Sequence, residues 1–324
     1  MRYAMAAKTP GGSEVLTQIE LGDVTAEAGE VVIEHEAIGV NFLDIYIRGG
    51  AYPWPVENNL VLGSEGAGTV VEIGADVTNF AVGDRVAYTQ PNGAYATHRA
   101  INSDLVVKLP DDIGTDIAAA IMLKGLTTAY LFKNSYEVKA GDTILFHAAA
   151  GGVGLIAGQW LKSLGATVIG TAGGPEKCAL ALAHGYDYVI DYKSQDFEAE
   201  VMRITNNVGV DAAYDSVGKD TMAATIRCVR RHGTIVNFGQ SSGKYDDFKI
   251  GDLTIGSLKL TRPTLFHFVN DPDWLPVASA QLFDLVSKGV LKININQRFA
   301  LGDLVAAHEA LTGRKTTGST ILIP

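Results

Sequence analysis

The first third of the chain alternates short apolar runs with turn-forming residues. Residues 30–40, EVVIEHEAIGV, and 68–74, GTVVEIG, are rich in β-branched side chains, which favour strands. Turn signals lie close to such runs, at TPGG (9–12), VGDR (82–85) and PNGA (91–94). Short strands joined by tight turns predict an antiparallel, barrel-like β domain of roughly 120 residues.

From residue 122 the pattern changes to alternating strands and helices. Residues 123–138 have helical spacing, with Leu126, Tyr130 and Leu131 on one face. Strands are expected at 142–147, 166–172, 188–191, 210–216 and 233–239, and helices after Gly152, from Glu176, near 195–206 and near 220–231. This alternation predicts a parallel sheet with helices on both faces, so the fold class is α/β.

After Pro263 the order changes again. We expect a helix at 274–289, a strand at 291–301, a helix at 303–314 and a final strand at 319–324. A tail of this size is too small to fold alone, so it should return to the first domain. The predicted domains are therefore residues 1–122 with 264–324, and residues 123–263.

Composition and charge narrow the class of protein. Apolar stretches are broken well before about 18 residues, and the N-terminus has no sustained apolar segment, so neither a membrane span nor a secretory signal is expected. The only cysteines, Cys178 and Cys228, argue against a disulfide framework and favour a reducing cytoplasm. A formal charge of −10 argues against nucleic acid or an acidic membrane as the main partner.

Residues 146–154, FHAAAGGVG, join an apolar strand to an amphipathic helix. At such a junction, free backbone N–H groups and the helix dipole favour an anion such as a pyrophosphate. Gly154 would also let the helix approach the strand closely. In this setting the pattern predicts a dinucleotide site, whereas the alternative is a tight turn without a ligand. The loop residues assigned to the cofactor are Ala150, Gly151, Gly152, Val153 and Gly154.

The end of the second strand indicates which dinucleotide binds. A site for NAD usually has Asp or Glu at this point, bound to the ribose 2′-OH. Here the strand ends in GTAGG (170–174), with no acid, and Gly173, Lys177 and Tyr192 lie at or after the strand ends. Small residues with a nearby cation suit a 2′-phosphate, so NADPH is predicted. The alternative for Lys177 is an exposed helix lysine, although helix N-termini disfavour cations.

Seven motifs, spread over nearly the whole chain, resemble the medium-chain dehydrogenase/reductase superfamily and, within it, the NADPH:quinone oxidoreductase family that includes zeta-crystallin. They are GVNFLDIYIRGGAYP (39–53), LGSEGAGTVVEIG (62–74), FAVGDRVAY (80–88), LKGLTTAYLF (123–132), HAAAGGVGLIAGQWLK (147–162), YDSVG (214–218) and NFGQSSG (237–243).

The resemblance implies a β-rich, partly open barrel (GroES-like) catalytic domain together with a Rossmann doubly wound parallel sheet. It implies NADPH-dependent reduction of quinones in the cleft between the two domains. It also implies a homodimer, in which the β-rich segment 256–265 at the sheet edge pairs with its twin.

Alcohol dehydrogenases of this superfamily bind catalytic zinc through a cysteine and a histidine. This chain has Asn41 and Ser64 at those positions, and two cysteines cannot supply the four of a structural zinc site. We therefore expect no metal. Without a Lewis acid, oxidation of simple alcohols is implausible, whereas an electron-poor quinone or conjugated enone needs less activation.

By resemblance, Asn41, Tyr46, Tyr52 and Thr127 face the nicotinamide and are the catalytic candidates. The tyrosines would bound a flat ring or donate a hydrogen bond to an oxyanion. Their alternative is ordinary packing under a loop, and that of Thr127 is a mid-helix threonine. Asp44 either orients its neighbours or caps the following turn.

The resemblance assigns Ser216, Phe238 and Gln240, at strand ends, to the ribose and carboxamide of the cofactor. Arg314 is the second partner expected for the 2′-phosphate, with Lys315 as an alternative donor. The competing interpretation of Arg314 is a cation at a helix C-terminus, which the helix dipole favours.

His147 and Glu65 invite catalytic assignments that we do not make. His147 ends a buried strand before the glycine loop, which indicates a core histidine rather than a general base. Glu65 stands in a glycine-rich turn, where a structural hydrogen-bonding role is favoured over a remnant of the zinc site.

Two other functions stay open. Within the same fold, the chain could reduce α,β-unsaturated carbonyls or enoyl thioesters. In a different class, the resemblance to zeta-crystallin includes lens proteins and RNA binding, but the acidic charge argues against RNA as the main partner.

Overall fold

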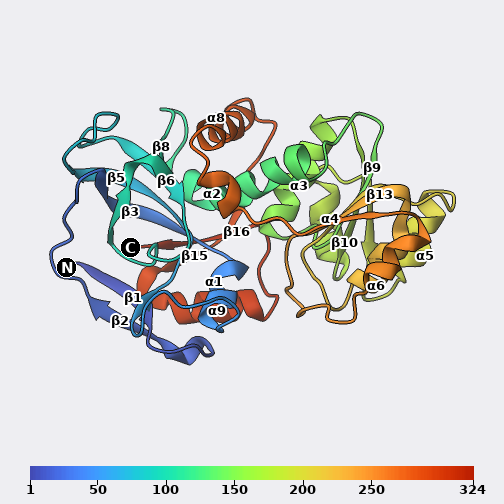
Figure 1. Cartoon of the computed structure of the whole chain (residues 1–324), viewed down its shortest axis with the longest axis horizontal. Coiled ribbons are helices and arrows are strands. Elements are labelled where there is room, and N and C mark those ends of the chain that lie inside the picture. Colours follow the sequence, from blue (N-terminus) through green and yellow to red (C-terminus); the bar gives the residue numbers. More distant parts are fainter. The chain divides into compact units, whose positions relative to one another are not determined.

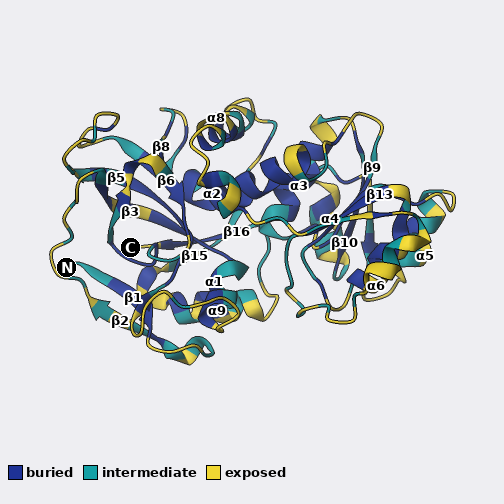
Figure 2. Ribbon diagram, in the orientation of Figure 1, coloured by how far each residue is buried: buried dark blue, intermediate teal, exposed yellow.

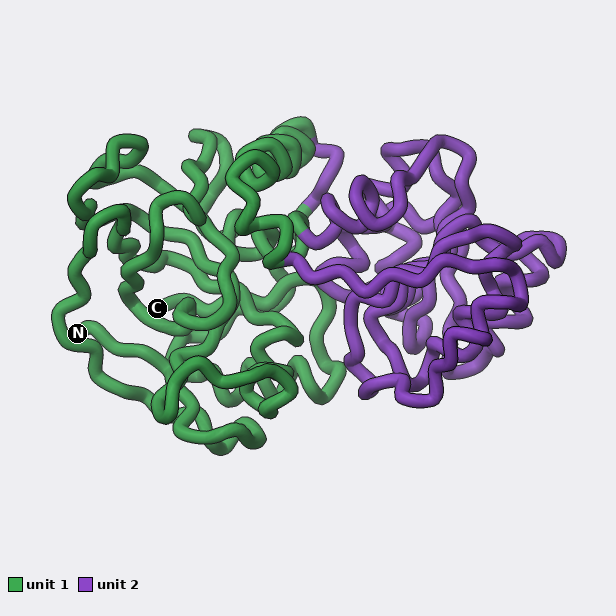
Figure 3. Tube along the Cα trace, viewed as in Figure 1, with its two compact units in different colours: residues 1–126, 266–288, 293–324 green, residues 127–265, 289–292 purple.

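The computed structural model describes residues 1–324, which form two compact units (Figure 3). Unit 1 consists of residues 1–126, 266–288 and 293–324, and unit 2 of residues 127–265 and 289–292. The long helix α2, Thr115–Tyr130, crosses the division at residue 126. No helix of the chain is long and apolar enough to cross a membrane.

Unit 1 is built on a seven-stranded sheet in the order β15-β16-β3-β5-β6-β8, with β7 paired to β3 (Figure 1). Its strands are β3 Glu30–Val40, β5 Glu65–Ile73, β6 Arg85–Thr89, β7 His98–Asn102, β8 Val106–Lys108, β15 Ile295–Ala300 and β16 Ser319–Ile323. A second sheet, β2-β1-β4, contains β1 Tyr3–Ala7, β2 Leu16–Glu20 and β4 Leu60–Val61. All pairs are antiparallel except β15–β16, and β16 brings the C-terminal segment back to β3.

The helices of unit 1, besides the first part of α2, are α1 Phe42–Arg48, α7 Phe266–Val269, α8 Trp274–Ser287 and α9 Leu304–Thr312. The strands contribute runs of buried residues to the core of unit 1, whose largest fully buried members include Ile33, Ile38, Leu62, Tyr88 and Tyr95. Figure 2 shows the strands largely in the colour of buried residues, with exposed residues in the loops and on the outer faces of helices.

Unit 2 is a six-stranded sheet in the order β11-β10-β9-β12-β13-β14, and every neighbouring pair is parallel. Its strands are β9 Thr143–Phe146, β10 Thr167–Ala172, β11 Tyr188–Asp191, β12 Val210–Asp215, β13 Val229–Asn237 and β14 Lys259–Thr261. The helices are α3 Gly152–Ser163, α4 Pro175–Leu182, α5 Phe197–Ile204 and α6 Met222–Cys228. The predicted doubly wound parallel sheet is therefore confirmed.

The strand order reverses between β9 and β12. From β9 the chain winds outward through β10 to β11, then returns to the other side of β9 to form β12, β13 and β14. Open α/β sheets bind ligands at the carboxyl ends of the strands beside such a reversal. The glycine loop follows β9 at this point.

Two of the predicted helices have wrong boundaries. The helix expected at 220–231 ends at Cys228, because Val229 pairs with Val210 and residues 229–231 join β13. The helix expected at 123–138 begins at Thr115 and ends at Tyr130, followed by a wide turn at Leu131–Ser135. Its start was missed because residues 118–123 are apolar and buried all round, which leaves no helical periodicity to detect.

Candidate active site

The loop between β9 and α3 is shaped so that only glycine fits at its end. A Cβ on Gly154 would lie 2.4 Å from the carbonyl oxygen of Ala148 and 2.6 Å from that of Ala149. The loop is tied to β10 by the N–H of Ala149, which donates to the carbonyl of Thr171 at 2.9 Å. At the start of α3, the N–H groups of residues 152–154 have no preceding turn to bond, and the helix dipole adds partial positive charge. This backbone fits a pyrophosphate.

At the end of β10, the side chain of Tyr192 lies against Gly173, where a Cβ would be 2.5 Å from the phenol oxygen. Gly174 follows with φ +97° and leads into the first turn of α4, which carries the half-buried Lys177. Asp191, at the end of β11, lies beside this turn, and its Oδ1 accepts the backbone N–H groups of Gly174 (2.8 Å) and Lys193 (3.0 Å). These bonds lower the pKa of Asp191.

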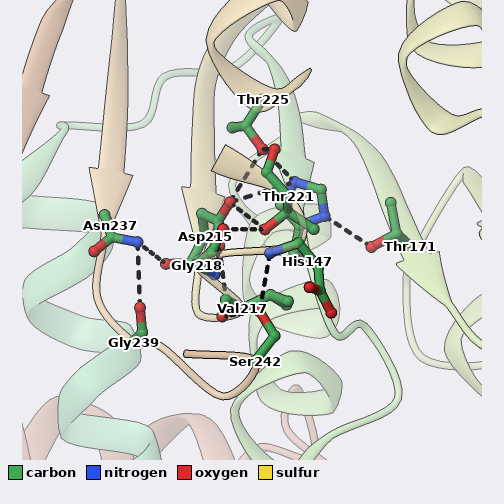
Figure 4. A network of polar contacts seen from close by, with 11 residues as sticks. His147, Thr171, Asp215, Val217, Gly218, Thr221, Thr225, Asn237, Gly239 and Ser242 are labelled. Atoms are coloured by element: carbon green, nitrogen blue, oxygen red, sulfur yellow. Dashed lines mark hydrogen bonds and ion pairs between the residues drawn. The ribbon is translucent and has the colours of Figure 1, made fainter. Parts of the chain in front are cut away.

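A buried polar network lies beneath the carboxyl ends of the central strands (Figure 4). Asp215, at the end of β12, is fully buried, and its Oδ1 accepts the N–H groups of Val217 (2.8 Å) and Gly218 (2.9 Å). Its Oδ2 accepts the hydroxyls of Thr221 (2.7 Å) and Thr225 (3.1 Å). One carboxylate therefore fixes the turn that begins at residue 216.

His147 belongs to the same network. It is fully buried, with Nδ1 at 2.9 Å from the Thr171 hydroxyl and Nε2 at 2.9 Å from that of Thr225. Burial lowers the pKa of His147, so the ring is neutral at pH 7. The Thr225 hydroxyl has two other close neighbours, the Asp215 carboxylate and the Thr221 carbonyl, and both can only accept its proton. The hydroxyl therefore accepts a hydrogen bond from Nε2–H of His147, and Nδ1 accepts one from the Thr171 hydroxyl. The interpretation of His147 as a core residue is confirmed.

The loops after β12 and β13 meet at this edge of the sheet. The amide of Asn237 donates to the carbonyls of Asp215 (3.3 Å) and Gly239 (3.2 Å) (Figure 4). Arg262, beyond β14, donates to the side chains of Asn237 and Gln240. A Cβ on Gly239 would lie 2.7 Å from the carbonyl oxygen of Ser216, so the two loops touch. The structure thus brings together Ser216, Phe238 and Gln240, as expected from their places at strand ends.

In unit 1, two buried acidic side chains hold the first turn of α1. Asp44 accepts the backbone N–H of Asn41 at 2.9 Å and the hydroxyls of Ser64 and Tyr95, both at 2.6 Å. Glu65 accepts the side-chain amide of Asn41 at 2.9 Å. Burial raises the pKa of Asp44 to about 6, against the opposing effect of its hydrogen bonds. Asp44 therefore both caps the helix and orients its neighbours, and the hydrogen-bonding role predicted for Glu65 is confirmed.

The other predicted residues lie at different places. Tyr46 is half-buried on α1, with its ring 6.2 Å from that of Phe42, and Tyr52 follows the helix with 42% of its surface exposed. Thr127 is buried in the second half of α2 and belongs to unit 2, whereas Arg314 is exposed after α9 in unit 1. Their contact with a cofactor or an acceptor stays a prediction.

Asn41 and Ser64 do not fit a zinc ion. The amide nitrogen of Asn41 faces Glu65, and the Ser64 hydroxyl donates to Asp44. No group of three or more His, Cys, Asp or Glu side chains is placed to hold a metal. An amide and a hydroxyl also lack the thiolate and imidazole donors of zinc sites. These side chains form a hydrogen-bonded network instead of a metal centre.

Sequence reasoning did not single out Lys124, Arg262 or the Asp215–Thr225 contact. Lys124 is the lone charged residue of the run 117–131, a signal that could have marked it as paired. Asp215 likewise ends an apolar strand. The partners of these residues come from distant segments, which no local pattern identifies.

Two family models match the chain: an alcohol dehydrogenase GroES-like domain over residues 27–111 and a zinc-binding dehydrogenase over residues 152–279. A quinone oxidoreductase of Pseudomonas aeruginosa is 47% identical over 97% of both chains. A 2-haloacrylate reductase of a Burkholderia species is 42% identical over 100% of this chain and 99% of its own. The crystal structure of Escherichia coli quinone oxidoreductase complexed with NADPH has a TM-score of 0.97 and 42% identity, over 99% of this chain and 100% of that one. With this agreement in sequence and fold over its whole length, the chain belongs to the quinone oxidoreductase family of the medium-chain dehydrogenase/reductase superfamily.

Proposed function

We propose that this protein is an NADPH-dependent, zinc-independent reductase of quinones. The observation that carries the proposal is the anion-binding loop at the strand reversal, next to a β10 end that presents Gly173, Lys177 and Tyr192 in place of an acid. A quinone oxidoreductase with the same fold, crystallised with NADPH, supports it.

Unit 2 supplies most of the residues for the cofactor. The loop of residues 150–154 binds the pyrophosphate through backbone N–H groups, while Gly173, Lys177 and Tyr192 receive the 2′-phosphate, with Arg314 as a further cation. Ser216, Phe238 and Gln240 receive the ribose and carboxamide. When bound, NADPH supplies the reducing equivalents, as a hydride or as single electrons, and the protein contributes binding and orientation.

The acceptor is expected against Asn41, Tyr46, Tyr52 and Thr127. These side chains are neutral, so they position a flat, electron-poor ring and donate hydrogen bonds to its developing oxyanion. A quinone needs no stronger activation than this. A saturated alcohol or a simple ketone would need the Lewis acid that this site has no ligands to hold.

The second candidate is a reductase of α,β-unsaturated carbonyls, favoured by the similarity to a 2-haloacrylate reductase. The test compares NADPH oxidation with quinones, alkenals, 2-haloacrylate and enoyl thioesters as acceptors. We expect the highest kcat/KM with quinones and a clear preference for NADPH over NADH. Activity with unsaturated carbonyls alone would replace the first candidate by the second.

The proposal includes a homodimer and a cytoplasmic location. Strand β14, within the segment 256–265, is an edge strand of the six-stranded sheet, and an exposed edge is a template for pairing with a second copy. Both cysteines are free thiols, in keeping with a reducing compartment.

Sedimentation velocity tests the dimer. We expect a particle with the mass of two chains. The dimer should dissociate when proline replaces the residue among Lys259, Leu260 and Thr261 whose N–H points away from β13, because proline cannot donate a hydrogen bond to a second copy. A single-chain mass at micromolar concentration would exclude the dimer.

A further inference from the structure

A buried ion pair lies directly beside the candidate catalytic residue Asn41. Glu65 is fully buried and Lys124 is 5% exposed, and the Nζ of Lys124 lies 2.5 Å from Oε1 of Glu65. The same Oε1 accepts the Asn41 amide at 2.9 Å, and Oε2 accepts the backbone N–H of Leu123 at 2.7 Å. The carboxylate therefore joins the first residue before α1 to the middle of α2, both within unit 1.

The backbone around Glu65 leaves room for this carboxylate. Gly39, on β3, is the cross-strand partner of Glu65, at the start of β5. A Cβ on Gly39 would lie 2.1 Å from Oε1 of Glu65 and 2.4 Å from the carbonyl oxygen of Ala119. Any other residue at position 39 would displace the carboxylate, so glycine at this position of β3 is required for Glu65 to lie there.

Stability alone is a weak reason for such a pair. Removing two charges from water costs several kcal/mol each, and well-packed apolar residues are often equally or more stabilising. A carboxylate can only accept hydrogen bonds, so it forces the nitrogen of the Asn41 amide toward itself and fixes the amide plane. An apolar pair would remove this acceptor from the amide nitrogen of Asn41.

We propose that Glu65 and Lys124 are positioning residues of the reductase: Glu65 fixes the orientation of the Asn41 amide toward the acceptor, and Lys124 compensates the charge of Glu65. The inference rests on the proposed function, because it requires Asn41 to face the acceptor. It predicts that Glu65 affects turnover only through Asn41.

The test is a double-mutant cycle on kcat at saturating NADPH and quinone. Glu65→Asp keeps the charge but withdraws the carboxylate by one methylene. It should lower kcat about tenfold in the wild-type background, which corresponds to about 1.4 kcal/mol of coupling. In an Asn41→Ala background the same change should leave kcat unaltered, while the thermal midpoint falls in both. Lys124→Arg should retain turnover that Lys124→Met loses.

An equal fold-loss in both backgrounds, or no loss in the wild-type background, would overturn the inference. Asp116→Asn is the matched control, because it removes an exposed ion pair with Arg298 from the same helix and should leave kcat unchanged. If Glu65→Asp does not fold, the charge-neutral E65Q/K124M takes its place in the cycle. A wild-type protein inactive with quinones overturns the proposed function instead, and the cycle is then run with an unsaturated carbonyl.

Discussion

The proposed preference for NADPH is assigned to single side chains, and the assignment of Lys177 can be tested directly. Lys177→Ala should weaken NADPH binding about 10- to 100-fold, because a charge-assisted hydrogen bond is worth about 1.5–3 kcal/mol. NADH, which has no 2′-phosphate, should bind nearly as before. Fluorescence titration with both coenzymes measures the difference.

Lys162→Ala is the matched control for this experiment. Lys162 lies in the last turn of α3, paired with Asp187 and away from the loop that starts the helix, so its loss should affect neither coenzyme. If Lys177→Ala weakened NADPH and NADH by the same factor, the assignment of Lys177 to the 2′-phosphate would be wrong.

At the scale of residues, the sequence predicts which chemical groups a site contains better than it predicts which residues contact one another. The absence of zinc donors at Asn41 and Ser64 can be read directly, because thiolate and imidazole ligands are irreplaceable by an amide and a hydroxyl. Lys124 could not be assigned in advance, because its partner Glu65 is 59 positions away and only the fold brings them together. Tertiary pairing of this kind has no local signal.

At the scale of elements, the strand–turn–helix of residues 143–163 depends on the close approach of helix and loop at Gly154. Gly154→Ala would place a Cβ 2.4 Å from the Ala148 carbonyl oxygen and force α3 away from the loop. We expect the free energy of unfolding to fall by about 1–3 kcal/mol. NADPH binding should weaken as well, because the N–H groups at the start of α3 move.

Gly151→Ala provides the comparison within the same loop. Its Cβ would lie 3.2 Å from its nearest neighbour, the carbonyl oxygen of Ala148, and the backbone there has φ −78°, which alanine adopts readily. Urea denaturation of both variants should show the larger loss for Gly154→Ala. Equal losses would mean that the loop relaxes and that the close approach of helix and strand is not required.

The ends of some helices and strands can be predicted from the sequence, whereas those of others cannot. The strand YVID (188–191) is correct at both ends, because apolar β-branched residues stop at an acid and a turn. The predicted end of α6 is wrong, because Val229, Arg230 and Arg231 continue the helical pattern in the sequence. Their strand conformation is imposed by β12, through the Val210–Val229 pairing and the ion pair of Arg230 with Asp211.

At the scale of the whole molecule, three buried histidines should make stability depend on pH. Burial lowers the pKa of His35 and His308 to about 3, and lowers that of His147 as well. These rings are neutral in the native state but bind a proton below pH 6.5 in the unfolded state. The unfolded state then holds more protons, so stability is lost as the pH falls below 6.5, by up to about 1.4 kcal/mol per pH unit for each ring that stays neutral in the native state. For His35 and His308 this loss continues toward pH 3.

Asp44 acts in the opposite direction over part of this range. Its pKa is raised to about 6, so the native state keeps a proton between pH 3.8 and 6 that the unfolded state has lost. The contribution of Asp44 to the free energy of unfolding therefore grows as the pH falls through this window, and it offsets the loss caused by about one histidine. The loss of stability is therefore expected to steepen as the pH falls from 6.5, because the unfolded histidines are only half protonated at that pH, and below pH 6 the proton on Asp44 holds the slope down by up to about one proton.

Urea denaturation at half-unit steps from pH 7.5 to 5 tests this balance. His35→Gln keeps a donor and an acceptor for the carbonyl of Ala96 and the hydroxyl of Tyr88, but cannot take up a proton. It should reduce the slope below pH 6.5 by about one proton. Asp44→Asn should instead steepen the slope below pH 6, because the offsetting carboxyl is gone. A stability that stays flat from pH 7.5 to 5 in the wild-type protein would mean that the histidines gain no protons on unfolding. The rings would then bind protons equally well in the native state, which requires water to reach them in both units.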